Sequence, residues 1–377
     1  MIFKQLLLGI IMRIIFVCGS LEVGRDGVGD YTRRLASELI RQGNQVAILA
    51  FNDRNVNGII REKQKQEGIN VNVLRLGSKA PARNRLRNAK TWIEEFNPEW
   101  ISLQYVPFSF HEKGLPWRLG NQLLKLGAGK SWHIMFHELW VGMDKKASFK
   151  NRIYGALQKY IIKNTINVLD PKIVHTQTCL YREHISQLGY KVELLPLFGN
   201  IPIIDLQEEK KNEDLIKIAV FGGIHFGANL KKMVKKLPEK NKYKFYFIGS
   251  NGPEQRNWID VLKEHNIDFR NYGWLENNEA SKALSRCQWG LTSTPYYLTE
   301  KSGSAAAMLE HNLTVFCIAR KWKPRNIRTK ILTNDSIIRW SNSLNIAGFV
   351  ENKDSKYEQN LEKVTRKFVK GLKSNQF

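Results

Sequence analysis

The stretch "VCGSLEVGRDGVGDYTRRLA", residues 17–36, runs from an apolar segment through a glycine-containing loop into a helical pattern. Its glycines lie where a strand would be followed by a helix, and backbone N–H groups at that point can face an anion. Read from Gly27 through Gly29, the order G-V-G-D-Y-T places Thr32 where a dinucleotide-binding fingerprint has its third glycine. This disfavours NAD, which stays open only because Asp53 follows after about 20 residues, where that fingerprint has its ribose-binding acid. The loop is expected to approach phosphates, although a tight turn would also explain both glycines.

Around this loop, apolar runs rich in β-branched residues alternate with helical patterns, which is typical of a parallel sheet with crossover helices. In the first half the expected strands are 13–18, 45–51, 71–76, 100–105, 131–136, 166–170 with 173–176, and 191–197, and the expected helices are 30–43, 83–96, 148–164 and 180–189. In the second half the expected strands are 216–223, 243–250, 267–273, 289–294 and 313–319, and the expected helices are 229–237, 255–266, 278–286, 302–312 and 356–372.

Between the two halves, residues 198–215 form a polar stretch with a proline and a charge run, which suits a linker. We therefore predict an α/β protein of two Rossmann-like domains, each a doubly wound parallel sheet, that face a central cleft. Residues 1–199 are expected to form the first domain and residues 200–377 the second, with the last helix a candidate to pack back onto the first domain. Ligands of such sheets bind at the carboxyl ends of the strands.

The chain has 377 residues and a formal net charge of +24, with 42% hydrophobic and 25% charged residues, which indicates a soluble globular protein with an anionic partner. Nucleotide phosphates, an anionic membrane face and nucleic acid would each satisfy that charge, as would a solvated basic surface without a partner. The strongest candidate patch is an acid-free segment, residues 77–90, which contains Lys79, Arg83, Arg85, Arg87 and Lys90.

The cysteines Cys18, Cys179, Cys287 and Cys317 stand far apart, so neither a disulfide framework nor a zinc site is expected, and a reducing cytoplasmic setting fits best. Residues 1–11 are apolar but too short and too interrupted for a spanning helix. They are expected to be a short extension, with an interfacial anchor as the alternative.

Several segments resemble, in order, the GT-B glycosyltransferases, and in particular the retaining enzymes of glycosyltransferase family four. "GRDGVGDYTRRLASELIRQGNQVAIL" resembles their amino-terminal glycine motif, "IMFHELW" (134–140) a strand that ends in a histidine and an acid, and "IAVFGGIHFGANL" the first strand of the carboxyl domain. The segment 272–319 resembles the donor-site region. The resemblance implies a first domain for the acceptor, a second for a nucleotide-sugar donor, and a transferase activity.

The resemblance also assigns residues. It places His137 and Glu138 at the mouth of the cleft as catalytic candidates, with His137 against the donor sugar, and Glu310 at the donor ribose. Two family features are missing, because Ser302 occupies the position of the family's first glutamate and its basic diphosphate-binding pair would fall near Gly223 and Asn229.

Another group must then balance the diphosphate, since an unpaired buried charge is costly. Lys301 directly precedes a small-residue helix start formed by Ser302, Gly303 and Ser304, where free N–H groups favour an anion. An ordinary serine-capped helix with a surface lysine is the alternative. His225, with Lys231 and Lys232, is a weaker substitute.

Residues 104–114 are rich in aromatics and contain His111, so they are expected to line an acceptor pocket, with simple core packing as the alternative. The apolar strands end in no Asp-x-Asp motif, so we predict a metal-independent enzyme with no cofactor beyond its co-substrate, a UDP-, GDP- or ADP-sugar. The predicted acceptor is a glycan or lipid-linked molecule of polysaccharide or glycolipid synthesis at the inner membrane face. A nucleic-acid acceptor and a non-catalytic GT-B-like binding protein remain alternatives.

Overall fold

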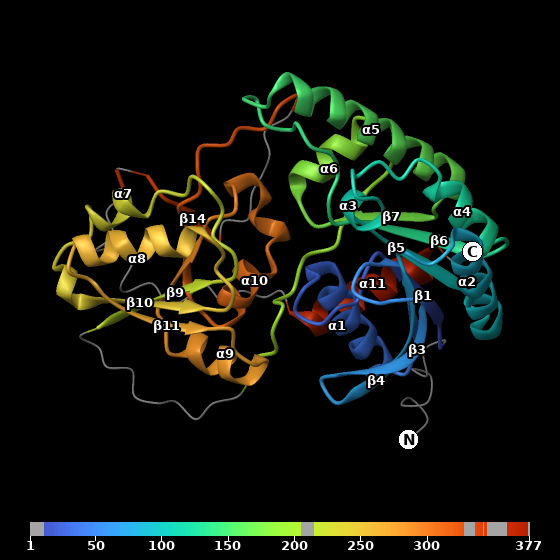
Figure 1. Ribbon diagram of the computed structural model, residues 1–377, viewed down its shortest axis with the longest axis horizontal. Coiled ribbons are helices and arrows are strands. Elements are labelled where there is room, and N and C mark those ends of the chain that lie inside the picture. Colours follow the sequence, from blue (N-terminus) through green and yellow to red (C-terminus); the bar gives the residue numbers. More distant parts are fainter. Residues whose placement is uncertain (1–10, 205–214, 328–335, 342, 345–359, 376–377) are drawn as a thin grey trace.

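The computed structural model describes residues 11–204, 215–327, 336–341, 343–344 and 360–375. Within them, the two halves of the chain each build one sheet, and the two sheets lie next to each other with helices around them (Figure 1). The α/β fold with two parallel-sheet domains that the sequence predicts is confirmed.

The first sheet has eight strands in the order β3-β4-β2-β1-β5-β6-β7-β8, all parallel to their neighbours except that β3 pairs antiparallel with β4. The strands are β1 (Arg13–Cys18), β2 (Gln45–Asp53), β3 (Ile59–Gln66), β4 (Ile69–Gly77), β5 (Trp100–Tyr105), β6 (Ser131–Phe136), β7 (Ile173–Thr176) and β8 (Glu193–Leu194). The helices of this half are α1 (Gly27–Arg41), α2 (Ala82–Phe96), α3 (Pro107–Phe110), α4 (Leu119–Leu126), α5 (Phe149–Leu169) and α6 (Cys179–Ser186).

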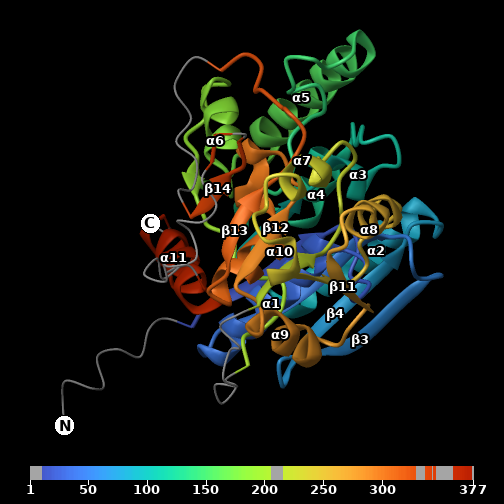
Figure 2. The ribbon, with the colours of Figure 1, turned by 90° about the vertical axis from the view of Figure 1, so that its left-hand side faces the viewer.

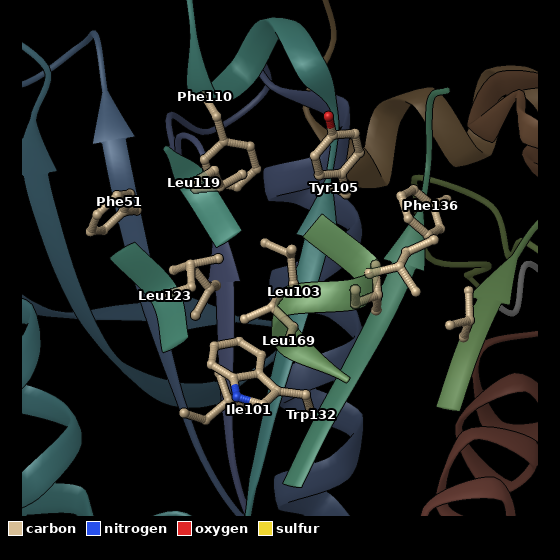
Figure 3. Close-up of a cluster of buried hydrophobic side chains, with 14 of the residues drawn as sticks. Phe51, Ile101, Leu103, Tyr105, Phe110, Leu119, Leu123, Trp132, Phe136 and Leu169 are labelled. Carbon is tan, nitrogen blue, oxygen red and sulfur yellow. The ribbon is translucent and has the colours of Figure 1, made fainter. Parts of the chain in front are cut away.

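The two faces of this sheet bury different side chains, because alternate residues of a strand point to opposite sides. On β5, Ile101, Leu103 and Tyr105 join an aromatic and aliphatic core to which α2, α4, α5 and α6 contribute side chains. Figure 3 shows these three residues among other side chains of that core. On the opposite face, Trp100 packs into a second core with residues of α1. The side chains of Ser102 and Gln104 are buried as well, so this strand carries polar groups inside the protein.

The second sheet has six strands in the order β11-β10-β9-β12-β13-β14, all parallel. Its strands are β9 (Ile216–Phe221), β10 (Tyr243–Ile248), β11 (Asp268–Gly273), β12 (Trp289–Thr292), β13 (Thr314–Cys317) and β14 (Ile337–Arg339). Its helices are α7 (Leu230–Val234), α8 (Glu254–Glu264), α9 (Asn277–Ser285) and α10 (Gly303–Glu310), with 3-10 turns η2 (Lys240–Lys242) and η3 (Tyr296–Lys301). Helices α7 and α8 cover one face, and α9 and α10 cover the other.

Helix α11 (Leu361–Ser374) lies on the first sheet, although it follows the whole second sheet in the chain (Figures 1 and 2). Val364, Phe368 and Leu372 are fully buried in the same core as Phe16 and α1, and the rings of Phe16 and Phe368 stack with centroids 5.8 Å apart. The first half therefore completes its core with residues from the far end of the chain.

Several details differ from the sequence prediction. Residues 166–169 belong to α5 and not to a strand, because a short apolar run such as "INVL" fits a buried helix face as well as a strand. The polar edge strand β3, "IIREKQKQ", was not predicted, since its few apolar residues hide the strand pattern. The expected helix at 356–372 begins at Leu361, and residues 356–359 lie outside the described part of the chain.

The chain passes from the first half to the second at Gly199. The backbone N–H and carbonyl of this residue form hydrogen bonds with residues of both halves. The N–H of Gly199 donates to Glu310 Oε1 on α10 at 2.8 Å, and its carbonyl oxygen accepts from the guanidinium of Arg34 on α1. A Cβ at this position would lie 2.5 Å from Glu310 Oε2 and 2.9 Å from the Cα of Ala307. Only glycine lets the chain pass here.

We expect Gly199→Ala to destabilise the protein by roughly 1–3 kcal/mol, because the added methyl group overpacks a site walled by backbone and by a carboxylate. Chemical unfolding would measure the loss. Gly223→Ala is the matched control, since nothing lies within 4 Å of a Cβ there. Equal stabilities of the two variants would contradict the role of Gly199.

Burial raises the pKa of Glu310 to about 7 from an ordinary 4.5, against the opposing effects of the Gly199 N–H and Arg34. The folded protein therefore resists ionisation of this carboxyl, and the wild type loses stability as the pH rises from about 4.5 to about 7. Glu310→Gln keeps an acceptor for Gly199 but cannot ionise. As the pH rises from 4.5 to 8, we expect the free energy of unfolding of this variant to gain about 1–3 kcal/mol relative to that of the wild type. Chemical unfolding at several pH values would measure this difference. A gain that does not depend on pH would contradict this explanation.

Candidate functional site

The predicted catalytic pair follows β6 directly, at the carboxyl end of the first sheet. The N–H groups of His137 and Glu138 both donate to the carbonyl oxygen of Tyr105 at the end of β5, at 3.1 and 3.4 Å. In the second sheet, β12 leads to η3, which ends at Lys301, two residues before α10 begins. The carboxyl ends of the two sheets thus supply the two sides of the candidate site.

Glu138 and Lys301 meet across the junction of the two halves. Lys301 Nζ lies 2.6 Å from Glu138 Oε1, and the side chains are 21% and 43% exposed. Burial disfavours the charge on Lys301, but Tyr181 and Glu138 outweigh that effect and raise its pKa, so the ammonium stays protonated. Lys301, which is predicted to bind the diphosphate, and Glu138, which is a predicted catalytic residue, therefore form one charge pair.

The start of α10 is arranged as a capped helix end. Ser302 Oγ accepts from the N–H of Ala305 at 3.3 Å and lies 3.2 Å from Ser304 Oγ. Gly222, in the loop after β9, would place a Cβ 3.0 Å from the Ser304 side chain. The predicted group of Lys301, Ser302, Gly303 and Ser304 lies together, and the serine cap of the alternative interpretation is present as well.

Arg320 is a residue that the sequence analysis missed. It follows β13, its guanidinium lies 3.0 Å from Asp144 Oδ2 of the first half, and its side chain packs beside Gly227. The pKa of His225 is lowered by burial and then by the charges of Lys301 and Arg320, so all three groups share one region. The N–H of His225 donates to Ser293 Oγ at 2.8 Å. The signal that could have found Arg320 is a basic residue just after an apolar strand of a parallel sheet.

Of the weaker substitutes for the missing basic pair, Lys231 lies on α7 and pairs with Glu264 at 2.8 Å on the exposed surface. Lys232 is exposed on the same helix, and its N–H donates to the cap residue Asn229. Both interactions belong to a solvated helix face.

The backbone also joins the two halves beside this site. Asp144 forms an antiparallel bridge with Pro324, the N–H of Lys145 donates to the carbonyl of Lys323 at 2.9 Å, and that of Arg325 to the carbonyl of Met143 at 2.8 Å. Glu300 Oε2 accepts from the N–H of Cys179 at the start of α6, at 2.9 Å. The structure therefore shows the two halves in direct contact here.

His137 is only 4% exposed, and both of its ring nitrogens have protein partners. Nε2 lies 2.8 Å from Gln104 Oε1, and Nδ1 lies 3.1 Å from Gln177 Nε2. Burial, reinforced by Lys301, lowers the pKa of His137 to about 3, so the ring is neutral. A contact of this ring with a donor sugar stays a prediction, and it would require one of these bonds to be exchanged.

Glu310 Oε1 accepts from the N–H of Gly199 at 2.8 Å. Its predicted contact with a donor ribose stays a prediction.

The two glycines of the opening loop have different surroundings. A Cβ on Gly29 would lie 2.8 Å from the carbonyl oxygen of Ser20, whereas a Cβ on Gly27 would meet nothing within 4 Å. Asp26 caps α1 and accepts from the N–H groups of Val28 and Gly29. The backbone N–H groups of Val28 and Gly29, which a phosphate would use, therefore already donate to the side chain of Asp26. The close contact with Ser20 explains why residue 29 is a glycine.

The predicted basic patch is exposed at Lys79, Arg83, Arg87 and Lys90 but not at Arg85. Arg85 donates to the carbonyl of Phe51 at 3.2 Å and to Asn52 Oδ1 at 3.1 Å, so it braces β2. Lys90 lies 3.7 Å from Glu94 on the same helix.

His111 is exposed in the turn after α3, where its Nδ1 accepts from the N–H groups of Lys113 and Leu115. Its proposed place in an acceptor pocket stays a prediction.

Among the residues described, we find no group of three or more His, Cys, Asp and Glu side chains that could hold a metal ion. Metal independence stays a prediction. Over the same residues, no helix has both the length and the apolar run needed to cross a bilayer.

The fold of this chain is similar to that of solved GT-B structures. It aligns with Anabaena HepE, solved with UDP and glucose, at a TM-score of 0.58 and 11% identity, over 96% of this chain and 100% of that one. It aligns with the pneumococcal O-GlcNAc transferase GtfA, solved with UDP and GlcNAc, at a TM-score of 0.56 and 9% identity, over 97% and 99% of the two chains. For AviGT4, a glycosyltransferase involved in avilamycin A biosynthesis, the TM-score is 0.52 and the identity 7%, over 97% and 98%.

No protein-family model matches the sequence. No curated protein matches it either. The structural similarities have identities of 7–11% and so concern the fold alone. The chain has the GT-B fold.

Proposed function

We propose that this protein is a glycosyltransferase that moves a sugar from a nucleotide-sugar donor to a glycan or a lipid-linked acceptor. The observation that carries the proposal is the charge pair of Glu138 and Lys301, which joins the carboxyl ends of the two sheets at 2.6 Å. Arg320 and His225 lie in the same region of the second half. Cationic groups at the carboxyl ends of parallel strands suit a ligand that carries phosphate.

A leaving diphosphate needs positive charge that is already in place. Lys301 and Arg320 would supply that charge in place of the basic pair that the resemblance leads one to expect. In the free protein each of them faces a carboxylate of the first half, Glu138 or Asp144. A bound diphosphate would replace these carboxylates as the partner of the cations, and Glu138 would be released toward the acceptor side.

The nucleotide in this proposal is uridine diphosphate. HepE and GtfA, which share the fold, were both solved with UDP and a sugar. The proposed reaction retains the anomeric configuration and needs no metal, as the resemblance to family four implies. Its place is the synthesis of a cell-surface polysaccharide or glycolipid.

We expect Lys301→Met and Arg320→Met each to weaken UDP binding about tenfold, which corresponds to about 1.4 kcal/mol, because each removes a charge-assisted contact to phosphate. Calorimetry with UDP, UDP-glucose and UDP-GlcNAc would measure this. Lys282→Met is the matched control, since Lys282 is a surface lysine of the same half that pairs with Glu279. If the wild type binds none of a panel of UDP-, GDP- and ADP-sugars, the proposal fails.

Donor hydrolysis distinguishes an enzyme from a binding protein. A transferase should release the sugar slowly into water, and Glu138→Gln should change that rate more than it changes donor affinity. Binding without any turnover, with or without candidate acceptors, would favour the non-catalytic alternative.

The proposed acceptor lies at an anionic membrane, and α5 offers a surface for it. Phe149, Ile153, Leu157 and Tyr160 are 77%, 50%, 37% and 64% exposed and recur at helical spacing, and the ring of Trp117 lies 6.3 Å from that of Tyr160. The helix carries no acidic residue but does carry Lys150, Arg152, Lys159 and Lys163. Figure 2 shows α5 projecting at the top of the molecule. An exposed apolar stripe among basic residues is typical of a helix that lies in the interface of an anionic bilayer.

We expect the protein to sediment with vesicles that contain phosphatidylglycerol and not with pure phosphatidylcholine vesicles at low salt. Replacing Phe149, Ile153 and Tyr160 together by serine should reduce binding at least about fivefold, because membrane affinity scales with the buried apolar area. Phe226→Ser is the control, since Phe226 is 81% exposed in the other half. Replacing Lys79, Arg83 and Arg87 by glutamine in parallel shows whether the basic patch at the start of α2 contributes. Binding to DNA but not to vesicles would instead support the nucleic-acid alternative.

A further inference from the structure

Buried polar side chains link His137 to the protein surface through the first sheet. Gln177 Nε2 lies 3.1 Å from His137 Nδ1, and His137 Nε2 lies 2.8 Å from Gln104 Oε1. This series of hydrogen-bonded side chains continues through β5, where Gln104 Nε2 lies 2.7 Å from Ser102 Oγ. Ser102 Oγ in turn lies 2.7 Å from His133 Nδ1.

The series then crosses to β7. His133 Nε2 lies 3.0 Å from His175 Nδ1, and His175 Nε2 lies 4.0 Å from Glu193 Oε2 at the start of β8. From Gln177 to His175 the side chains are at most 5% exposed, whereas that of Glu193 is 48% exposed. The series therefore begins beside the candidate site and ends at the surface.

The arrangement follows from strand alternation. Ser102 and Gln104 are two residues apart on β5, and the residues from β6 and β7 lie beside them on the same face. Helix α11 covers this face. The ring of Phe368 lies 5.1 Å from that of His133, and a Cβ on Gly371 would lie 3.4 Å from His175 Cε1. The hydrogen bonds are thus shielded from water.

Both ends of the series specify the same direction. At one end the amide nitrogen of Gln177 can only donate and the amide oxygen of Gln104 can only accept, so His137 carries its hydrogen on Nε2. At the other end the carboxylate of Glu193 favours a hydrogen on Nε2 of His175, which makes Nδ1 of His175 an acceptor for His133. Ser102 then donates to His133 and accepts from Gln104. Every donor points from Gln177 toward Glu193.

We propose that Glu193, acting through His175, His133, Ser102 and Gln104, holds His137 in a single tautomer, with the hydrogen on Nε2. These are positioning residues. Reversing the direction would move the hydrogen of each ring from Nε2 to Nδ1, would turn both amides by 180°, and would leave a lone pair of His175 facing the carboxylate. Hydrogen bonds aligned in one direction also strengthen one another in a dry environment. Burial, the first cause in each case, lowers the pKa of His133, His137 and His175, so the rings stay neutral as the series requires.

The charged groups around the series are placed at its ends. Lys301 faces His137, Lys367 on α11 faces His175, and Lys191 lies 3.6 Å from Glu193. Glu193 is the acid that lies against the last ring. A change at Glu193 should therefore be felt at His137, although the side chains between them are buried and belong to three other strands.

The test is nitrogen-15 NMR of histidine-labelled full-length protein at pH 7, without any donor. In the wild type we expect His137, His133 and His175 each to show a protonated Nε2 and a bare Nδ1. In Glu193→Lys the new ammonium can donate to His175, so we expect the rings, His137 included, to move to the opposite tautomer or to a mixture. Glu193→Gln, whose amide can serve either direction, should give a mixture.

Ser102→Ala cuts the series in the middle. In the double variant with Glu193→Lys, we expect the tautomers of His133 and His175 still to change, whereas the tautomer of His137 should no longer respond to residue 193. Ser102→Thr, which keeps a hydroxyl, should restore that response. The controls are Glu279→Lys, a surface charge reversal in the other half, and Thr176→Val on β7, which removes a hydroxyl that donates to the carbonyl of Phe136. An unchanged His137 signal in Glu193→Lys, whether or not His175 responds, would overturn the inference.

The inference rests on the proposed function only for its catalytic meaning, because His137 adjoins Glu138 and Lys301. The two can fail separately. A tautomer change in Glu193→Lys together with no binding of any nucleotide sugar by the wild type would support the series and reject the transferase. Donor binding together with an unchanged His137 signal would do the opposite.

Discussion

The arrangement of the whole molecule depends on one peptide segment, at Gly199, that both halves hold by hydrogen bonds. Arg34 on α1 donates to its carbonyl oxygen, and Glu310 on α10 accepts from its N–H. The ring of the preceding Phe198 stacks on Tyr31 with centroids 4.7 Å apart, and the guanidinium of Arg34 lies 5.5 Å from the centroid of the Phe198 ring. Because the crossing point is fixed by residues of both halves, the carboxyl ends of the two sheets come to face each other.

Two ion pairs across the junction of the halves have the same polarity. Glu138 and Asp144 belong to the first half, and their partners Lys301 and Arg320 belong to the second. Glu138 and Arg320 are partly open to water, so a junction built from these opposite charges gives way to a stronger anion more easily than an apolar contact would. The same interactions can therefore hold the free protein closed and receive a charged ligand.

Much of the fold could be predicted from the sequence, because strands that are buried on both faces of a parallel sheet appear as continuous apolar runs. The edge strand β3 could not, since its residues are mostly polar, and neither could the end of α5, where a short apolar run fits two structures. For the site, position after a strand was enough to find His137, Glu138 and Lys301. Arg320 was overlooked because no motif includes it. Gln104 and Gln177 were overlooked because a glutamine amide is not a typical catalytic group and does not stand out in a sequence. That both nitrogens of His137 are occupied depends on three strands that are distant in sequence.

Helix α11 has a consequence for how the protein is made. Its residues Val364, Phe368 and Leu372 fill the core between the first sheet and α1, and the second sheet lies between the two in the chain. In a nascent first half, the part of this sheet face around His133 and His175 is therefore not yet covered by α11. It must wait for the whole second half to be synthesised before that face is covered. The order of synthesis is thus opposed to the order in which this core can close, and the growing chain is a natural client for a chaperone.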